Sequence, residues 1–578
     1  MREDNYWRRH SLSRRSVLRG AVAGSAGIAG AVLIGCGSDD EESTTTSAAP
    51  AAAAPAAPAA TAAPAVAAAP AAPPQGGTLR ARIHGDPPNW SVMKPSSATT
   101  HAVSELIYDK LLKVKTGPGV GRTEVTAVPS LAEDMPEVSP DGLEYIFKIP
   151  SGVKFQNVAP INGRDLTSED VATCIMHFAT TGNFKRDFAR VQSAEAVDGN
   201  TIKVTLSAPY APLINLSAGH YGWRIFPPEI LENDLHKSEA IGSGPWIRES
   251  YEQGNKAVYV RNPDYWAGDK GAYLEKIEHV IIPDDSAAGA AFGAGEVDLL
   301  IGRLPCVQAQ ELAKQVGDTA TVQIAPGNSA WFGLNTSGKP FDDIRVRQAV
   351  ALGYDRQADS DAIFCGTGTV TGLIPMDEAL FPEDAAAFPE AASWLRYDVA
   401  EAKKLLAAAG YADGVKTTAV FTPRYGQVYQ FGLERAIGDL KKIGMEVEPI
   451  AYEYGEWIQG IYRSPYAFEG ILWGPGRNYP DADPYVGYWL HPEGIANHSR
   501  VNDPVITDLI EKQRTQTNPA ERWETLHEVQ RVEAKNMYYV WRTAGDSTNF
   551  IADWVGDYNH HAGYDSGEYA HVYDKRLA

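Results

Sequence analysis

The stretch LEYIFKI at residues 143–149 predicts a β-strand, because apolar residues occupy positions 143, 145, 147 and 149 at period two. LTSEDVATCIMHF at 166–178 predicts a helix. There, Thr167 and Asp170 have the spacing of a capping box ahead of an apolar face. A strand followed by a capped helix indicates an α/β fold.

The same two signals continue on both sides of this stretch. TIKVTL at 201–206 alternates like a strand. A helix is predicted from Asp398, with Glu401 three residues later and Gly410 as its stop, and another from Asn518. We therefore expect residues 78–578 to form α/β lobes.

The bulk composition restricts the class of partner. The chain has 578 residues, 44% of them hydrophobic and 22% charged, as in an ordinary soluble protein. Its formal net charge of −21 repels nucleic acid and acidic lipid, so we expect neither as a partner.

The first 77 residues have the features of an export signal followed by a linker. A basic segment containing Arg14 and Arg15 precedes an uncharged apolar run, which predicts a signal peptide over residues 1–35. The segment around the two arginines resembles a twin-arginine export motif, with general secretory export as the alternative. LIGC at 33–36 resembles a bacterial lipobox, which implies a lipid on Cys36; the alternative is a secreted protein with an incidental cysteine.

An Ala/Pro-rich tract follows, so residues 36–77 are expected to be a disordered linker beginning at the lipidated cysteine. An extended tract from 48 to 74 at ~3.1 Å per residue reaches roughly 80 Å. Such a tether would hold the folded part away from a membrane that only the lipid contacts.

The other cysteines are Cys174, Cys306 and Cys365, far apart and without any CxxC pair. An odd number cannot be fully paired within one chain. We expect most of them to be buried small apolar residues.

Several blocks of residues 78–578 follow one another in the order and spacing of a known family. The region resembles family 5 extracellular solute-binding proteins of bacterial ABC transporters, which include oligopeptide, dipeptide and nickel binders. The blocks are LIYDKLL (106–112), PSLAE (129–133), SPDGLEY (139–145), LTSEDV (166–171), GSGPW (242–246), RNPDYW (261–266) and PFDDIRVRQA (340–349).

The resemblance implies a two-lobed periplasmic-binding-protein-like fold. Lobe I would hold residues 78–325, with an extra subdomain at about 115–235, and lobe II residues 326–545; 546–578 would return to lobe I. Closure of the lobes would trap a solute for the transporter's permease subunits. The protein would be a monomer on the outer face of the cytoplasmic membrane, periplasmic or extracellular, with no enzymatic activity, cofactor or metal.

The segment ILWGPGRNYPDADP at 471–484 resembles the family's loop at the cleft. Peptide binders carry an aspartate before its tyrosine, which holds the ligand's α-amine. Here that position is Asn478, and the neighbouring Arg477 favours an acidic or polyhydroxyl group. The candidate ligand-binding residues are Trp473, Arg477, Asn478, Tyr479, Asp481, Trp331 and Tyr425.

Other interpretations remain open. Core packing is the alternative for the two tryptophans, and a cap or surface charge for Asp481. His560, His561 and His571 do not have the spacing of a strong metal motif. A peptide is the default solute, and an oligosaccharide, an opine-like acid or a metal complex is the alternative. A lipoprotein hydrolase or a sensory receptor is the competing function.

Overall fold

The structure is a computed structural model. Of the predicted functional residues, Arg14, Arg15, Cys36, Arg477 and Asn478 lie outside the residues that it describes. The described residues are 73–91, 98–117, 119–121, 124–182, 184–219, 221–232, 234–268, 272–302, 304–325, 331–370, 372–374, 389–474, 476, 479–545, 547–560, 569 and 571–577.

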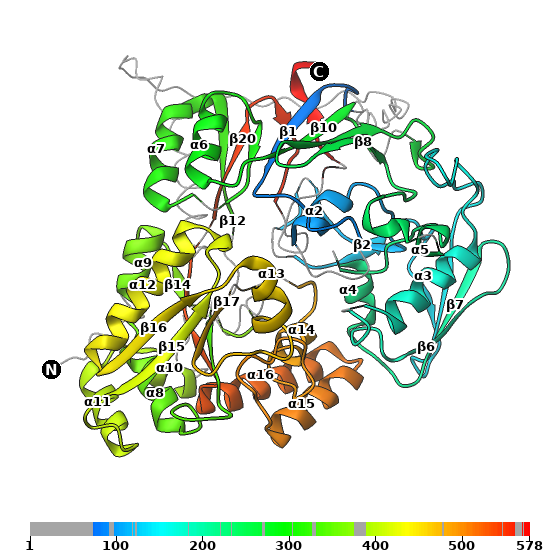
Figure 1. Cartoon of the computed structure of the whole chain (residues 1–578). Helices are drawn as coiled ribbons and strands as arrows, with labels where there is room; N and C mark the ends of the chain where they lie inside the picture. Colours follow the sequence, from blue (N-terminus) through cyan, green and yellow to red (C-terminus); the bar gives the residue numbers. More distant parts are fainter. Residues whose placement is uncertain are drawn as a thin grey trace, which may run out of the picture. The chain divides into compact units, whose positions relative to one another are not determined.

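A seven-stranded sheet, in the order β12-β20-β11-β1-β10-β9-β8, is the centre of lobe I (Figure 1). β1 runs parallel to β10 and β11, and the other neighbours are antiparallel. β20 comes from the C-terminal part of the chain and pairs with both β12 and β11. The strands are β1 (Thr78–Ile83), β8 (Trp246–Glu252), β9 (Lys256–Arg261), β10 (Lys276–Ile281), β11 (Leu299–Leu300), β12 (Ala320–Ala325) and β20 (Ser547–Ala552).

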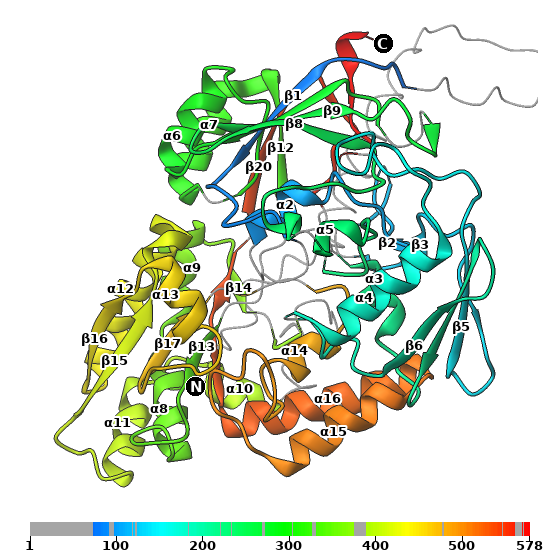
Figure 2. The same cartoon turned by 45° about the vertical axis from the view of Figure 1, so that its right-hand side comes forward.

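Helices α6 (Asp285–Gly293) and α7 (Cys306–Val316) pack on this sheet. Phe292, Leu312 and Phe550 lie in their shared apolar cluster. Both views place the two helices beside β12 and β20 (Figures 1 and 2). Burial of this apolar cluster stabilises this end of lobe I.

A separate antiparallel sheet in the order β4-β5-β7-β6 lies within the segment predicted to be the extra subdomain. The strand predicted from residue 143 is β5, and the helix predicted after it is α3, which packs on β6 and β7. The side chain of Thr167 accepts from the backbone N–H of Asp170, and the side chain of Asp170 accepts from the backbone N–H of Thr167. The predicted capping box is therefore confirmed. The elements are β4 (Glu137–Val138), β5 (Glu144–Lys148), α3 (Ser168–Thr180), β6 (Val191–Ala196) and β7 (Thr201–Leu206).

Short elements connect the two sheets of lobe I. β2 and β3 pair with each other, and α4 packs against both. They are α2 (Ala98–Ser104), β2 (Leu112–Val114), β3 (Ala127–Pro129), α4 (Leu213–Ala218) and α5 (Glu229–Glu232).

Lobe II is built on a five-stranded sheet in the order β16-β15-β17-β13-β18. β16, β15 and β17 are parallel, and β13 is antiparallel to both β17 and β18. β18 therefore runs in the same direction as β17. The strands are β13 (Trp331–Leu334), β15 (Val415–Phe421), β16 (Met445–Ala451), β17 (Ile471–Gly474) and β18 (Tyr539–Trp541).

Two helices of lobe II begin where the sequence predicts. Asp398 caps α11, and Asn518 caps α16. α12 packs on β16, and α8 packs on α11. The helices are α8 (Ile344–Gly353), α9 (Arg356–Phe364), α10 (Pro389–Leu395), α11 (Val399–Ala408), α12 (Gln427–Lys442), α13 (Tyr454–Glu456), α14 (Asp483–Gly487), α15 (Pro504–Thr515) and α16 (Pro519–Asn536).

The chain crosses between the lobes twice, after β12 and again after β18. Beside the second crossing, β14 (Thr369–Val370) pairs with β19 (Thr543–Ala544). A further pair, β21 (Val555–Gly556) with β22 (Tyr573–Asp574), closes the C-terminal part.

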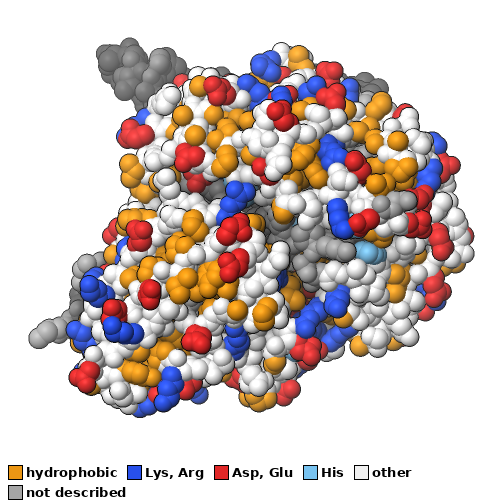
Figure 3. Space-filling model, in the orientation of Figure 1, with side chains coloured by type: hydrophobic (Ala, Val, Ile, Leu, Met, Phe, Trp, Pro, Cys, Tyr) orange, Lys and Arg blue, Asp and Glu red, His pale blue; other side chains and the backbone are white. Residues whose placement is uncertain are grey.

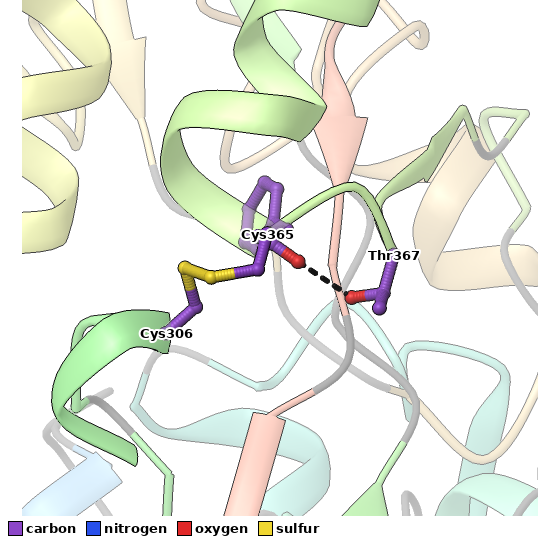
Figure 4. The surroundings of a disulfide bond; sticks show 4 residues. Cys306, Cys365 and Thr367 are labelled. Carbon is purple, nitrogen blue, oxygen red and sulfur yellow. Dashed lines mark hydrogen bonds between the residues drawn. A yellow bond between two sulfur atoms is a disulfide. The ribbon is translucent and has the colours of Figure 1, made fainter. Parts of the chain in front are cut away.

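A disulfide joins the lobes near these crossings. Cys306 at the start of α7 in lobe I is bonded to Cys365, which follows α9 in lobe II (Figure 4). Next to it, the hydroxyl of Thr367 donates to the carbonyl of Phe364 at 2.8 Å. The expectation that most of the three cysteines are buried apolar residues is wrong, since only Cys174 is free and buried. Sequence could not show the pairing because 59 positions separate the partners.

Candidate functional site

The carboxyl ends of four strands of lobe II lie at one edge of the sheet, which we call the carboxyl edge. β16 ends at Ala451, β15 at Phe421, β17 at Gly474 and β18 at Trp541. Trp331, the first residue of β13, is paired with both Gly474 and Trp541 in the register. In open α/β sheets, ligands bind beyond the carboxyl ends of the strands.

The carboxyl edge lies against lobe I. A Cβ atom on Gly85 of lobe I would lie 1.9 Å from Nη2 of Arg424, just beyond β15. A Cβ atom on Gly426 would lie 2.7 Å from a carboxylate oxygen of Asp285. The two lobes are therefore in direct contact here, and the absence of side chains on Gly85 and Gly426 permits the close approach.

Aromatic rings from separate elements gather on one face of the sheet at this edge. The indole of Trp473 stacks on Phe332, with ring centroids 5.7 Å apart, and donates from Nε1 to the carbonyl of Tyr429 at 3.0 Å. The Tyr429 ring on α12 lies 6.1 Å from Trp473 and 5.2 Å from Tyr425. The structure thus brings together the candidates Trp473 and Tyr425, with Tyr429 between them.

An arginine completes this group. Arg542 follows β18 directly, and its Cζ lies 3.5 Å from the centroid of the Trp473 ring. The residue is 6% exposed, and its Nε has no hydrogen-bond partner within the part of the chain that the structure describes. A Cβ atom on Gly432 of α12 would lie 3.0 Å from Nη2, so this glycine leaves room for the guanidinium.

Trp331 lies on the opposite face of the same sheet. Its ring contacts Trp489, His498 and Tyr539 at centroid distances of 4.9–5.2 Å. Successive residues of a strand point to opposite faces, and Trp331 is paired with Gly474 rather than with Trp473. The two tryptophans therefore do not share a site, and in this structure both are buried.

Tyr479 and Asp481 lie further along the loop after β17, where lobe II again meets lobe I. The ring of Tyr479 lies 6.4 Å from that of Tyr221 of lobe I. Both carboxylate oxygens of Asp481 accept hydrogen bonds from Arg522, at 2.5 and 3.0 Å, and Asn215 of lobe I donates to one of them at 3.1 Å. The Asp481 carboxylate is thus already paired in this structure.

Residues 126–497 match the family model of bacterial extracellular solute-binding proteins, family 5. The chain belongs to this family. Its relatives are binding proteins rather than enzymes, so the chain is a solute-binding protein and not a hydrolase.

Two curated relatives show the range of the family. Heme-binding protein A of Haemophilus influenzae is 28% identical over 451 residues, covering 73% of this chain and 78% of the relative. Di/tripeptide-binding protein 1 of Pseudomonas aeruginosa is 24% identical over 469 residues, covering 75% of this chain and 82% of the relative.

Solved structures share the two-lobed fold. DppA of Helicobacter pylori, in complex with the peptide STSA, has a TM-score of 0.75 at 24% identity and covers 87% of this chain and 99% of its own. MoaA of A. tumefaciens R10, in complex with mannopinic acid, has a TM-score of 0.74 at 24% identity and covers 86% and 100%. These likenesses confirm the fold class predicted from the sequence.

The described residues of this family 5 protein also bear on metal binding and on membrane spanning. No group of three or more His, Cys, Asp or Glu side chains among them could hold a metal ion. None of the helices in that part of the chain is long and apolar enough to cross a membrane. On the face drawn in Figure 3, acidic and basic side chains are interspersed.

A second contact between the lobes surrounds α14; we call it the α14 interface. From lobe I it contains Asp187, Tyr210 and Asn215, and from lobe II Asp481, Asp483 and Tyr488. The hydroxyl of Tyr488 donates to Asp187, and Nε of Arg514 donates to Asp483 at 2.7 Å. The contact is built from buried polar groups, so its strength depends on their charge states.

Burial raises the pKa of Asp187 to about 7, and the bond from Tyr488 opposes the rise. Asp483 raises this pKa further, while Arg514 and Arg463 lower it. Between an unfolded value near ~4 and about 7, the folded protein keeps a proton that the unfolded chain loses. The contribution of Asp187 to stability is therefore fully present below about pH 4 and is lost as the pH rises through about 7.

We expect Asp187→Asn to flatten the fall in unfolding free energy over this pH range, because an amide does not titrate. Urea unfolding at several pH values between about 4 and 8 measures it. Tyr488→Phe removes the bond that favours the ionised carboxylate and should extend the fall to higher pH. An unchanged pH profile in Asp187→Asn would contradict the assignment.

Sequence reasoning missed Tyr429, Arg424, Arg522 and Arg542. A lone arginine after a strand, or a tyrosine on a helix, carries no pattern that distinguishes a site from a surface. The weak signal for Arg542 was its position just after the apolar run YYVW at 538–541. Arg477 and Asn478 lie outside the described residues, and the ligand role of the other candidates stays a prediction.

Proposed function

We propose that this protein captures a peptide-sized solute between its two lobes, outside the cytoplasmic membrane, and delivers it to the permease subunits of an ABC importer. One observation carries the proposal. The carboxyl edge of the lobe II sheet, with Trp473, Tyr425, Tyr429 and Arg542, lies directly against lobe I. Aromatic surface with a few fixed polar groups suits a small organic solute.

A peptide is the default solute. A relative named for di/tripeptide binding and a structural neighbour holding the peptide STSA support it. A neighbour holding mannopinic acid supports the opine-like alternative, and the relative named for heme binding adds heme to the compounds worth testing. Asn478 in place of an aspartate favours a solute that is not held by a free α-amine.

The delivery route completes the proposal. Residues 1–35 direct export by the twin-arginine motif at Arg14 and Arg15. Cys36 carries a lipid, and the linker to residue 77 lets a monomeric two-lobed body reach the permease. Lobe I (78–325 with 546–578) and lobe II (326–545) rotate about the two crossings, so that bound solute favours the closed state.

Binding is expected to raise the melting temperature and to reduce the radius of gyration. A solute at a hundredfold its Kd adds about 2.7 kcal/mol to the folded state. Differential scanning fluorimetry against di- and tripeptides, glutathione, mannopinic acid, oligosaccharides and heme identifies the solute, and small-angle scattering with and without it measures closure. A saturating solute that leaves the scattering unchanged would contradict hinge closure.

A further inference from the structure

Arg542 is a buried charge with no ion-pair partner among the residues that the structure describes. Only 6% of the residue's surface is exposed, and its Nε has no hydrogen-bond partner among the described residues. None of the ion pairs found in that part of the chain includes it. Burying an ionised group in this state is costly, so a ligand group of opposite charge would be strongly favoured beside it.

Two other arginines of lobe II show what a structural arginine looks like here. Arg356 donates to the carbonyls of Trp541 and Ala351 at 2.9 and 2.8 Å. Arg435 donates from Nε to Asp359 at 2.8 Å. Arg542 stacks instead on the indole of Trp473. This cation–π contact uses the flat face of the guanidinium and provides no acceptor for the N–H groups in the guanidinium plane.

Arg542 lies where we propose that the solute binds. It follows β18, so it lies at the carboxyl edge, where lobe II meets lobe I. The hydroxyl of Tyr429 is also buried and without a partner in the described part of the chain. Arg542 and Tyr429 thus both lie against the Trp473 indole, and each has a buried polar atom without a partner among the described residues.

We propose that Arg542 is the anion subsite of this protein and that its solute carries a carboxylate or another planar oxyanion that binds there. The inference rests on the proposed function and names the class of solute within it. The indole holds the guanidinium plane, the in-plane N–H groups donate to the two oxygens of the anion, and Tyr429 supplies a further donor. Because the site is buried, the pairing is strong only when the lobes enclose it.

The first test uses the ligand-free protein. Arg542→Met removes an unpaired charge and keeps the stem, so its melting temperature should rise by about 2–4 °C. Arg356→Met is the matched control, and it should lower the melting temperature because it breaks bonds to main-chain carbonyls. A lower melting temperature for Arg542→Met would overturn the proposal, since it would show that the guanidinium is paired or held by the indole alone.

The second test uses matched probes in isothermal titration: trialanine against trialanine amide, and mannopinic acid against its carboxamide. Wild type should bind at least one acid about a hundredfold more tightly than its amide. The Arg542→Met variant should bind the acid and its amide equally, and Arg542→Lys should keep part of the difference. Tyr429→Phe should lower the affinity for the acid by about tenfold.

The outcomes separate the two proposals. Equal affinity for the acid and amide forms would overturn the anion subsite and leave the solute-binding function standing. Binding of no probe here and of no compound in the wider panel would count against the proposed function. In that case the sign of the change in melting temperature still decides whether Arg542 is an unpaired charge.

Discussion

Replacing Cys306 and Cys365 together with serine is expected to lower the free energy of unfolding by about 4 kcal/mol. The disulfide closes a loop of 59 positions and so restricts the unfolded chain. It also joins α7 of lobe I to α9 of lobe II, so the ligand-free variant should open more widely than wild type. Chemical unfolding measures the first effect, and the radius of gyration of the ligand-free protein measures the second.

The double variant carries its own control. Adding a reductant should destabilise the wild type toward the variant and leave the variant unchanged, because Cys174 is buried and free in both. A wild type whose unfolding does not respond to a reductant that demonstrably cleaves the bond would show that the disulfide does not constrain the lobes.

Cys36→Ala is expected to move the protein from the membrane fraction into the soluble exported fraction. The proposed lipid is attached at this thiol, and the Ala/Pro tract after it has no apolar span that would hold a bilayer. Fractionation followed by immunoblotting measures the distribution, and metabolic labelling with a fatty acid reports the lipid itself.

Ser38→Ala is the matched variant, since it changes the same segment and keeps the thiol. It should stay with the membrane. Retention of Cys36→Ala in the membrane fraction would remove the lipid anchor from the proposal, and the chain would then be exported by the same signal without a tether.

The roles of the cysteines could be predicted from the sequence to different extents. A lipid on Cys36 could be predicted because a lipobox is a local pattern next to an apolar run. Cys306 and Cys365 have no local pattern around them. The odd number of remaining cysteines showed only that one of the three cannot form a disulfide within the chain. Their pairing depends on where α7 and α9 end in space, which is a property of both lobes together.

The sequence by itself determined the class of the fold, the start of the main helices and the family. Alternation at period two and a capping residue act within a few positions, so β5, α3, α11 and α16 follow from local sequence. The family blocks are likewise short and ordered. This is why the two-lobed α/β fold and the absence of enzymatic function could be predicted.

Only the tertiary structure decided which side chains share a site. Trp331 and Trp473 were both candidates in the sequence, with core packing favoured for Trp331. The register that pairs Trp331 with Gly474 sends their rings to opposite faces of the sheet. The same sheet brings β18 alongside β13, and α12 packs nearby. Arg542, 69 positions after Trp473, and Tyr429, 44 positions before it, therefore both lie against its indole. Strand pairing and helix packing join residues that are distant along the chain, and no local pattern contains that information.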